Sequence, residues 1–231
     1  SYISVRDEWT KQMVQSITGR NDVFIAPDPV FSFNQNLYMN IPKKEEILIK
    51  YGLQKNYILL SFSTWYNTSE YIATIANEVK KRGFQAVAFP MPENLFSFGL
   101  ETNVELPLDP LDWYALILYS KGYIGERMHP IVVCLHNSIP FYCFDEYGIY
   151  ARSLWGLRKK YLPNSSKTYL IVKEANLLSN LYSYKSEEKL PDASFVMDKI
   201  VYFSKDKCDS FAKRYQSYYE ECMQSVLNST F

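Results

Sequence analysis

Between residues 57 and 144 the chain alternates short apolar runs with amphipathic stretches, and this alternation restricts the fold more than any other feature. The apolar runs have the length of buried strands and cover residues 57–62, 84–89, 123–124 and 140–144. Helical patterns lie between them, at residues 67–81, 109–120 and 130–136. Units that alternate in this way predict a right-handed βαβ series around a parallel sheet flanked by helices, which is a Rossmann-like α/β fold.

Both ends of the chain add elements to this series. We expect a strand at residues 1–5, a helix at 7–18 and a strand at 23–26, followed by a polar stretch to about residue 55. We expect the first strands to join the same sheet. A charged spacer at residues 185–192 precedes a tail that is mainly helical. The predicted domains are therefore a Rossmann-like donor-binding domain over residues 1–184 and a mainly helical C-terminal extension over residues 185–231.

Charge and hydropathy exclude several classes of partner. The 231 residues carry a formal net charge of zero, whereas nucleic-acid binders usually have a basic excess. The densest basic cluster, at residues 158–160, is short, and we interpret it as an exposed helix end. No apolar run approaches the roughly 20 residues of a membrane span. We therefore expect neither a nucleic-acid partner nor a transmembrane segment.

The cysteines and the absent motifs point to a reducing compartment and to chemistry without a cofactor. Cys134, Cys143, Cys208 and Cys222 form no Cys-x-x-Cys pair, and no secretory signal opens the chain. We expect buried thiols and a cytoplasmic protein, and a peripheral position at the inner membrane face stays open. The chain has no dinucleotide, P-loop or zinc-binding fingerprint, so we expect no metal and no cofactor.

The run Gly-Tyr-Ile-Gly-Glu-Arg-Met-His-Pro at residues 122–130 concentrates the chemically useful side chains. A predicted strand ends here, Gly125 allows a sharp turn, and Pro130 suits the first position of the next helix. The turn would lie at the carboxyl edge of the sheet, where open α/β folds bind ligands. The free amides of Ile131 and Val132, together with the helix dipole, predict an anion site.

Arg127 and His129 flank this predicted anion site. A guanidinium group matches phosphate or carboxylate, and an imidazole can donate to the same anion or deliver a proton. The structural alternative stays open. Arg127 would then pair with Asp7, Glu126 or Asp145, and His129 would only cap the helix.

Two further residues follow predicted strands. Arg6 lies between the end of the first predicted strand and the start of the helix that follows. An arginine at the end of a buried strand requires an anion. Asp7 beside it is a suitable helix cap. Asp28 stands between two prolines in a rigid turn, where it either contacts a ligand or braces the turn. We expect Arg6 and Arg127 to point into one cleft.

Four short motifs, in this order and spacing, resemble the polysaccharide pyruvyl transferase family. They are Ser-Val-Arg-Asp at residues 4–7, Asp-Pro-Val at 28–30, Ile-Gly-Glu-Arg-Met-His at 124–129 and Ser-Ile-Pro at 138–140. Together they span about residues 1–150. The resemblance implies one half of a GT-B-like two-domain fold. It also implies that the N-terminal half of the family fold is absent, so we interpret this chain as a fragment.

The resemblance further implies an activity and a set of site residues. Members of this family move a pyruvyl group from phosphoenolpyruvate onto two hydroxyls of one sugar, which forms a cyclic ketal. The family element that binds phosphoenolpyruvate falls on Arg127, Met128 and His129, and the arginine of its Arg-Asp element falls on Arg6. Asp28 completes the expected substrate-binding set. The expected partners are phosphoenolpyruvate and a sugar or lipid-linked oligosaccharide acceptor.

Proton delivery to the methylene carbon of phosphoenolpyruvate requires a positioned acid. His129 is the first candidate for this catalytic role, and Glu126 is the second. The chain departs from the family pattern at two positions, because it has Glu126 before the arginine and Pro130 after the histidine.

Two other functions stay open. The chain could be half of a GT-B glycosyltransferase that uses a nucleotide sugar, with Asp145 or Glu146 holding the ribose. It could also be a carbohydrate-binding module without chemistry, because 16% of its residues are aromatic and such side chains stack on sugar faces.

Overall fold

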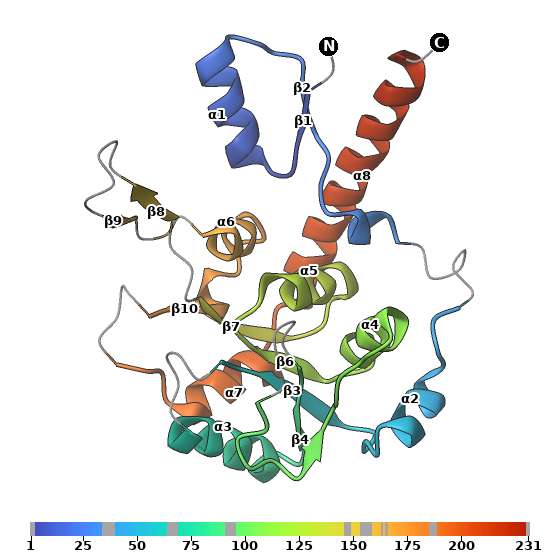
Figure 1. The fold of residues 1–231 in the computed structure, drawn as a ribbon, viewed down its shortest axis with the longest axis vertical. Helices are drawn as coiled ribbons and strands as arrows, with labels where there is room; N and C mark the ends of the chain where they lie inside the picture. Colours follow the sequence, from blue (N-terminus) through green and yellow to red (C-terminus); the bar gives the residue numbers. More distant parts are fainter. Residues whose placement is uncertain are drawn as a thin grey trace.

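A six-stranded parallel sheet forms the centre of the molecule (Figure 1). The structure, a computed structural model, describes residues 3–33, 40–63, 69–90, 96–145, 149–152, 159–162, 164, 166–184 and 189–229. The strand order in the sheet is β10-β7-β6-β3-β4-β5. Its strands are β3 (Tyr57–Ser61), β4 (Gln85–Ala88), β5 (Thr102–Asn103), β6 (Gly122–Gly125), β7 (Phe141–Asp145) and β10 (Leu181–Ser183).

The central strands are apolar on both faces because helices cover both sides of the sheet. Every residue of β3, β6 and β7 is buried, which explains why these strands read as continuous apolar runs. Ile58 of β3 pairs with Ala86 of β4 on one side, and Leu60 pairs with Ile124 of β6 on the other. The predicted fold class, a Rossmann-like parallel sheet flanked by helices, is confirmed.

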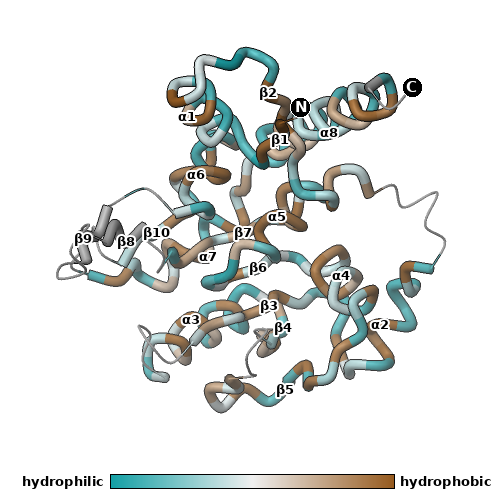
Figure 2. The backbone as a smooth tube through the Cα atoms, turned by 45° about the horizontal axis from the view of Figure 1, so that its top comes forward, coloured by the Kyte–Doolittle hydropathy of each residue, from teal (hydrophilic) through white to brown (hydrophobic). Residues whose placement is uncertain are grey.

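Helices form a layer on each face of the sheet (Figures 1 and 2). Leu59 points into one core and Ile58 into the other, since successive strand residues face opposite sides. The first core receives side chains from α2 (Lys44–Lys50), α4 (Pro110–Leu118), α5 (Met128–Asn137), α6 (Lys167–Glu174) and α8 (Lys205–Ser229). The second core receives them from α3 (Ser69–Lys81) and α7 (Ala193–Val201).

Residues 3–25 form a separate small βαβ unit. β1 (Ile3–Val5) and β2 (Val23–Ile25) pair in parallel with each other, and α1 (Glu8–Thr18) connects them. The expectation that these strands join the central sheet is wrong. After β2 the short 3-10 helix η1 (Pro29–Ser32) leads toward the main body, and α8 packs against both η1 and β2 (Figure 1). The long last helix therefore links the small unit to the main body.

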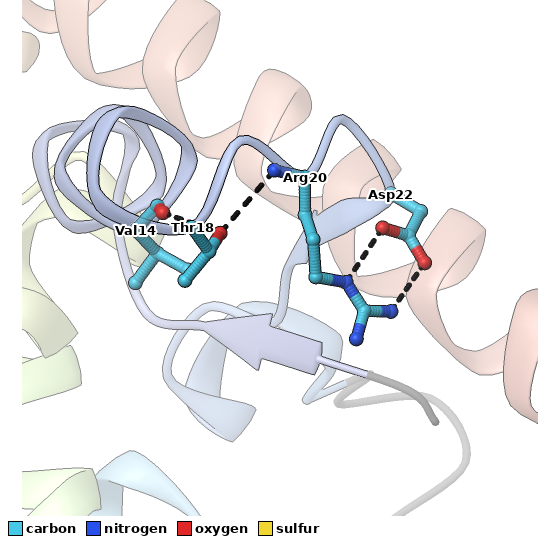
Figure 3. Close-up of polar contacts among 4 residues, drawn as sticks. All are labelled: Val14, Thr18, Arg20 and Asp22. Carbon is cyan, nitrogen blue, oxygen red and sulfur yellow. Dashed lines mark hydrogen bonds and ion pairs between the residues drawn. The ribbon is translucent and has the colours of Figure 1, made fainter.

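A compact turn returns α1 to β2 (Figure 3). Gly19 ends the helix in the left-handed conformation, with φ 68°, which glycine adopts without strain. The hydroxyl of Thr18 donates to the Val14 carbonyl at 2.7 Å, and it accepts from the Arg20 amide at 3.3 Å. Arg20 Nε donates to Asp22 at 2.8 Å and lowers the pKa of that carboxyl. Asp22 is exposed and Arg20 is partly exposed, so we expect this ion pair to contribute little to stability.

Several elements lie where no element was predicted. The polar stretch before residue 55 contains α2, whose Ile47 is fully buried; seven residues are too few to give a clear helical period. Lys159 begins a strand, so the interpretation of residues 158–160 as a helix end is wrong for its described part. The other unpredicted elements are β5, β8 (Ile149–Arg152), β9 (Lys159–Leu162), α6, the 3-10 helix η2 (Leu178–Asn180) and β10.

The C-terminal region is helical, as predicted, and its helices share the cores of the sheet. Met197 and Ile200 of α7 belong to one core, and Phe211 and Tyr215 of α8 belong to the other. The domain boundary at residue 184 stays a prediction. Among the described helices, none combines the length and the apolar character needed to cross a bilayer.

All four cysteines are free and buried, as expected. Burial raises the pKa of the Cys134 and Cys143 thiols, so both stay protonated at neutral pH. These residues therefore act as small apolar side chains of the core.

Candidate functional site

The carboxyl ends of β3 and β6 lie at the point where the sheet changes its winding direction. From β3 the chain crosses through α3 to β4, and from β6 it crosses through α5 to β7 on the opposite side. The two crossovers use opposite faces of the sheet. In open α/β sheets, ligands bind in the crevice at such a switch point. The segment that follows β6 is therefore where a binding site is expected, and it lies at the carboxyl edge as predicted.

Glu126 joins the two strand ends at this switch point. The residue follows β6 directly and is fully buried. Its amide donates to the Ser61 carbonyl at 3.1 Å, and its carboxylate Oε2 accepts from the Ser63 amide at 2.9 Å. Tyr184, just after β10, donates to the other carboxylate oxygen at 3.4 Å. The carboxylate of Glu126 therefore fastens three segments that are far apart in the sequence.

Gly125 is needed here because the chain approaches its neighbours closely. A Cβ atom at this position would lie 2.4 Å from the Ser61 carbonyl oxygen and 2.5 Å from the Tyr123 hydroxyl. Neither distance is compatible with a side chain. The glycine thus lets β6 lie against the end of β3, and it places the next residues at the rim of the crevice.

Helix α5 begins two residues earlier than predicted. Arg127 is its N-cap, with extended backbone angles, and Met128 is its first residue. Pro130 is therefore the third residue of the helix rather than the first. Proline is tolerated there, because the amides of the first turn have no partner within the helix.

This earlier start moves the free amides of α5. In an α-helix the carbonyl of the N-cap accepts from the fourth residue after it, so the amide of Ile131 is already used. The prediction that residues 131 and 132 provide the free amides is therefore wrong. The amides without a partner in the helix are those of Met128 and His129. Because an arginine side chain has no acceptor, Arg127 leaves these amides available to an anion.

The small βαβ unit and the helices α5, α6 and α8 all contribute residues to a cavity of about 430 Å³, which we call the Arg6 cavity. Arg6 lines it from the small unit, Asp28 from the turn before η1, and Met128 and Lys167 from the main body. The guanidinium of Arg6 lies 3.8 Å from the carboxylate of Asp28. That carboxylate also accepts from the Val30 amide at 3.2 Å and caps η1. Asp28 therefore braces its turn and also faces a cavity.

A second cavity of about 390 Å³ lies beside the first, and we call it the Trp113 cavity. The two cavities share Asp28 and Val132 as lining residues. Met128 lines the Arg6 cavity, whereas the exposed side chain of His129 lines the Trp113 cavity. Met128 and His129, which are consecutive at the start of α5, therefore line neighbouring cavities.

The structure brings most of the predicted site residues to this junction. Arg6, Asp28 and Met128 meet at the Arg6 cavity, although Arg6 follows a strand of the small sheet and not of the central one. The prediction that the guanidinium groups of Arg6 and Arg127 share one cleft stays a prediction. The sequence patterns missed Lys167, because it belongs to a short helix that no local signal marked.

The histidine and acid residues outside this junction have structural contacts. His136 Nε2 lies 3.1 Å from the Phe33 carbonyl, and burial lowers its pKa. Asp145 is buried and accepts from the Ser166 hydroxyl at 2.5 Å. Glu146 lies outside the described residues. Among the residues that the structure describes, no group of His, Cys, Asp and Glu side chains could hold a metal ion.

The parallel sheet, its switch point and the helix start at the crevice define a Rossmann-like domain, one half of a GT-B-like architecture. The model of the polysaccharide pyruvyl transferase family matches residues 1–146, which is more than half of the chain. The chain therefore belongs to the polysaccharide pyruvyl transferase family. No curated protein matches it in sequence.

Several solved structures are similar to this chain at low sequence identity. LpCGTa, solved in complex with UDP, is similar with a TM-score of 0.51 and 8% identity over 98% of this chain and 54% of its own. The wall teichoic acid polymerase TagF has a TM-score of 0.45 and 12% identity over 99% of this chain and 59% of its own. UGT2 of Phytolacca americana has a TM-score of 0.46 and 9% identity over 95% of this chain and 50% of its own. The chain thus spans between half and three fifths of these proteins.

Proposed function

We propose that this chain binds phosphoenolpyruvate and takes part in transferring its pyruvyl group to a sugar of a polysaccharide or glycan precursor, which forms a cyclic ketal. The observation that carries this proposal is the position of Arg127, Met128 and His129. In a member of this family, these three residues form the start of α5 at the switch point of the sheet. The acceptor would be a sugar or a lipid-linked oligosaccharide.

The charges around α5 suit this donor. Phosphoenolpyruvate carries a phosphate and a carboxylate, and both are anions that guanidinium groups and helix N-termini bind. Arg6 lines the adjoining cavity, Arg127 occupies the N-cap position of the helix without a capping hydrogen bond from its side chain, and the amides of Met128 and His129 have no partner in the helix. These groups can hold two anionic ends of one small molecule without a metal ion.

The chemistry then needs one proton delivered to carbon and two hydroxyls. Protonation of the methylene carbon makes the adjacent carbon electrophilic. A sugar hydroxyl bonds to that carbon, and a second hydroxyl of the same sugar then bonds to it and closes the ketal. The bond between that carbon and the phosphate oxygen breaks, and phosphate leaves. One hydroxyl proton balances the proton given to the methylene carbon, and the other leaves with phosphate.

We assign the proton donor to His129 rather than to Glu126. His129 is exposed and lines the Trp113 cavity, which adjoins the Arg6 cavity. Its side chain can therefore reach a bound substrate. The carboxylate of Glu126 is buried and accepts from the Ser63 amide and from Tyr184. These contacts favour a positioning role for Glu126.

The Trp113 cavity is the place that we propose for the acceptor sugar. Trp113 is partly exposed, and its ring packs on Phe89 with ring centroids 6.0 Å apart. Aromatic faces of this kind stack on the apolar face of a sugar ring. Since the two cavities share Asp28 and Val132, a sugar bound here would lie beside the donor.

A thermal-shift comparison tests the proposal with three probes. Phosphoenolpyruvate should raise the melting temperature of this chain, because a ligand at about 100 times its Kd stabilises a protein by about 2.7 kcal/mol. UDP or a neutral oligosaccharide alone should raise it less. Stabilisation by UDP and not by phosphoenolpyruvate would favour a nucleotide-sugar glycosyltransferase. Stabilisation by oligosaccharide alone would indicate a carbohydrate-binding module.

We also propose a cytoplasmic location and no cofactor. The four free, buried cysteines suit a reducing compartment. For the glycosyltransferase alternative, the expected ribose-binding residue Asp145 is already bound by Ser166. That contact makes the alternative less favourable.

A further inference from the structure

Lys167 is a cation at the Arg6 cavity that the proposed chemistry does not use. It is the first residue of α6 and is exposed. It lines the cavity from α6, whereas Arg6 lines the same cavity from the small βαβ unit. Among the described residues, its ammonium group has no hydrogen-bond or ion-pair partner. The charge of Lys167 is therefore available to a ligand.

The position of Lys167 is unfavourable for its own helix. The N-terminus of a helix carries a partial positive charge, so a lysine in the first turn destabilises it. Helix α6 is already capped, since Ser166 accepts from the Tyr169 amide at 2.8 Å. Lys167 thus has no role in holding α6 together. Residues that break a local rule without a structural gain are often found at functional sites.

The carboxylates of the cavity do not neutralise Lys167. Asp7 accepts from the Thr10 amide at 2.7 Å and caps α1. Asp28 accepts from the Val30 amide and lies 3.8 Å from Arg6. Both carboxylates are therefore engaged by other groups. A small anion in the cavity would meet Arg6 from the small βαβ unit and Lys167 from α6.

We propose that Lys167 binds the phosphate group of phosphoenolpyruvate, together with Arg6, in the Arg6 cavity. This inference rests on the proposed function and adds a donor-binding residue to it. A lysine ammonium is a compact point charge that suits phosphate, whereas the planar fork of Arg127 also matches a carboxylate. The cavity of about 430 Å³ lies within the size range of small-molecule sites.

Isothermal titration of phosphoenolpyruvate into this chain tests the assignment. Lys167→Gln should weaken binding about tenfold to a hundredfold, as expected for one lost hydrogen bond to a charged group. Lys167→Arg should retain most of the affinity. The matched control is Lys173→Gln, which removes an exposed lysine in the last turn of the same helix. It should leave binding unchanged.

Lys167→Glu separates binding from structure. A glutamate in the first turn suits the helix dipole, so the ligand-free melting temperature should stay the same or rise. Binding of phosphoenolpyruvate should nevertheless be lost. If Lys167 were only structural, the melting temperature and the affinity would fall together.

Competition with inorganic phosphate and with pyruvate assigns the group that Lys167 contacts. Lys167→Gln should weaken the binding of phosphate and leave that of pyruvate unchanged. The assignment is overturned if the variant binds phosphoenolpyruvate as the wild type does, or if only pyruvate binding weakens. If the wild type itself fails to bind phosphoenolpyruvate, the proposed function fails and this assignment fails with it.

Discussion

Arg127 is the single residue on which the proposed donor site depends most. Arg127→Ala should weaken phosphoenolpyruvate binding about tenfold to a hundredfold, because a hydrogen bond to a charged group contributes about 1.5–3 kcal/mol. The melting temperature should not fall through loss of a helix cap, since the arginine side chain makes no capping hydrogen bond to α5. Calorimetric titration and thermal melts measure the two effects.

The control is Arg127→Lys, which keeps the charge but loses the planar fork. It should recover part of the affinity and not all of it. A lower melting temperature with unchanged affinity in Arg127→Ala would instead make Arg127 a structural ion-pair partner.

His129 can be tested apart from donor binding. His129→Asn keeps a hydrogen-bond donor but cannot deliver a proton to carbon. Transfer, followed by phosphate release in the presence of the acceptor glycan, should fall by about a hundredfold or more, in line with the usual effect of general acid catalysis. Phosphoenolpyruvate affinity should change little.

Glu126→Gln is the matched variant for this assignment. Its amide oxygen can still accept from the Ser63 amide, so the three joined segments should stay in place. We expect Glu126→Gln to retain more transfer than His129→Asn. The reverse order would move the acid to Glu126.

At the scale of elements, the approach of β6 to β3 positions the start of α5. Gly125→Ala should destabilise the protein by about 1–3 kcal/mol, the usual range for an overpacked core. Its Cβ would lie 2.4 Å from a backbone oxygen, and the backbone cannot move aside cheaply. Urea denaturation measures the change in free energy of unfolding.

Gly122→Ala is the control on the same strand. Its Cβ would lie 2.9 Å from Cγ2 of Ile200, a side-chain atom that can shift more easily than a strand backbone. We expect a smaller loss of stability from this variant. Equal losses would show that close approach at Gly125 has no special role in holding β6 against β3.

For the molecule as a whole, Glu174 marks the place where the small βαβ unit meets the main body. It is half-buried on α6, and Tyr215 of α8 donates to its carboxylate. Burial raises the pKa of Glu174, and the nearby charges of Asp7 and Glu8 raise it further. The Tyr215 hydrogen bond and Arg214 lower the pKa but do not cancel the effect of burial.

This raised pKa predicts a pH dependence of stability. Between the ordinary carboxyl value of 4.5 and the higher folded value, the folded state binds more protons than the unfolded state. Stability therefore falls as pH rises through this window. Glu174→Gln, which stays neutral and can still accept from Tyr215, should melt at a higher temperature than the wild type near neutral pH. The difference should disappear below about pH 4, where Glu174 is protonated in both states.

Thermal melts of the two proteins across this pH range measure the effect. Equal melting temperatures at every pH would mean that the junction around Glu174 opens before the main body unfolds. A lower melting temperature for the variant at neutral pH would contradict the sign of the pKa shift.

The sequence by itself determined the parallel sheet, most of its central strands and the position of the Arg-Met-His segment at the carboxyl end of β6. These features follow from burial, since a strand covered on both faces must be apolar and a βαβ series fixes which strand ends share an edge. The cluster of Arg127, Met128 and His129 was therefore located correctly with respect to the sheet. Gly125 was also recognised, although its role is close approach to β3 and not only a turn.

Only the tertiary structure decided how distant segments meet. The pairing of β1 with β2 outside the central sheet, the contact of Glu126 with Ser63 and the cavity shared by Lys167 and Arg6 all join residues far apart in the chain. Local periodicity carries no information on such contacts. The start of α5 was misplaced for a related reason. Proline fits any position in the first turn, so Pro130 alone does not fix the first residue, and the Glu126 contacts that hold this segment are made in three dimensions.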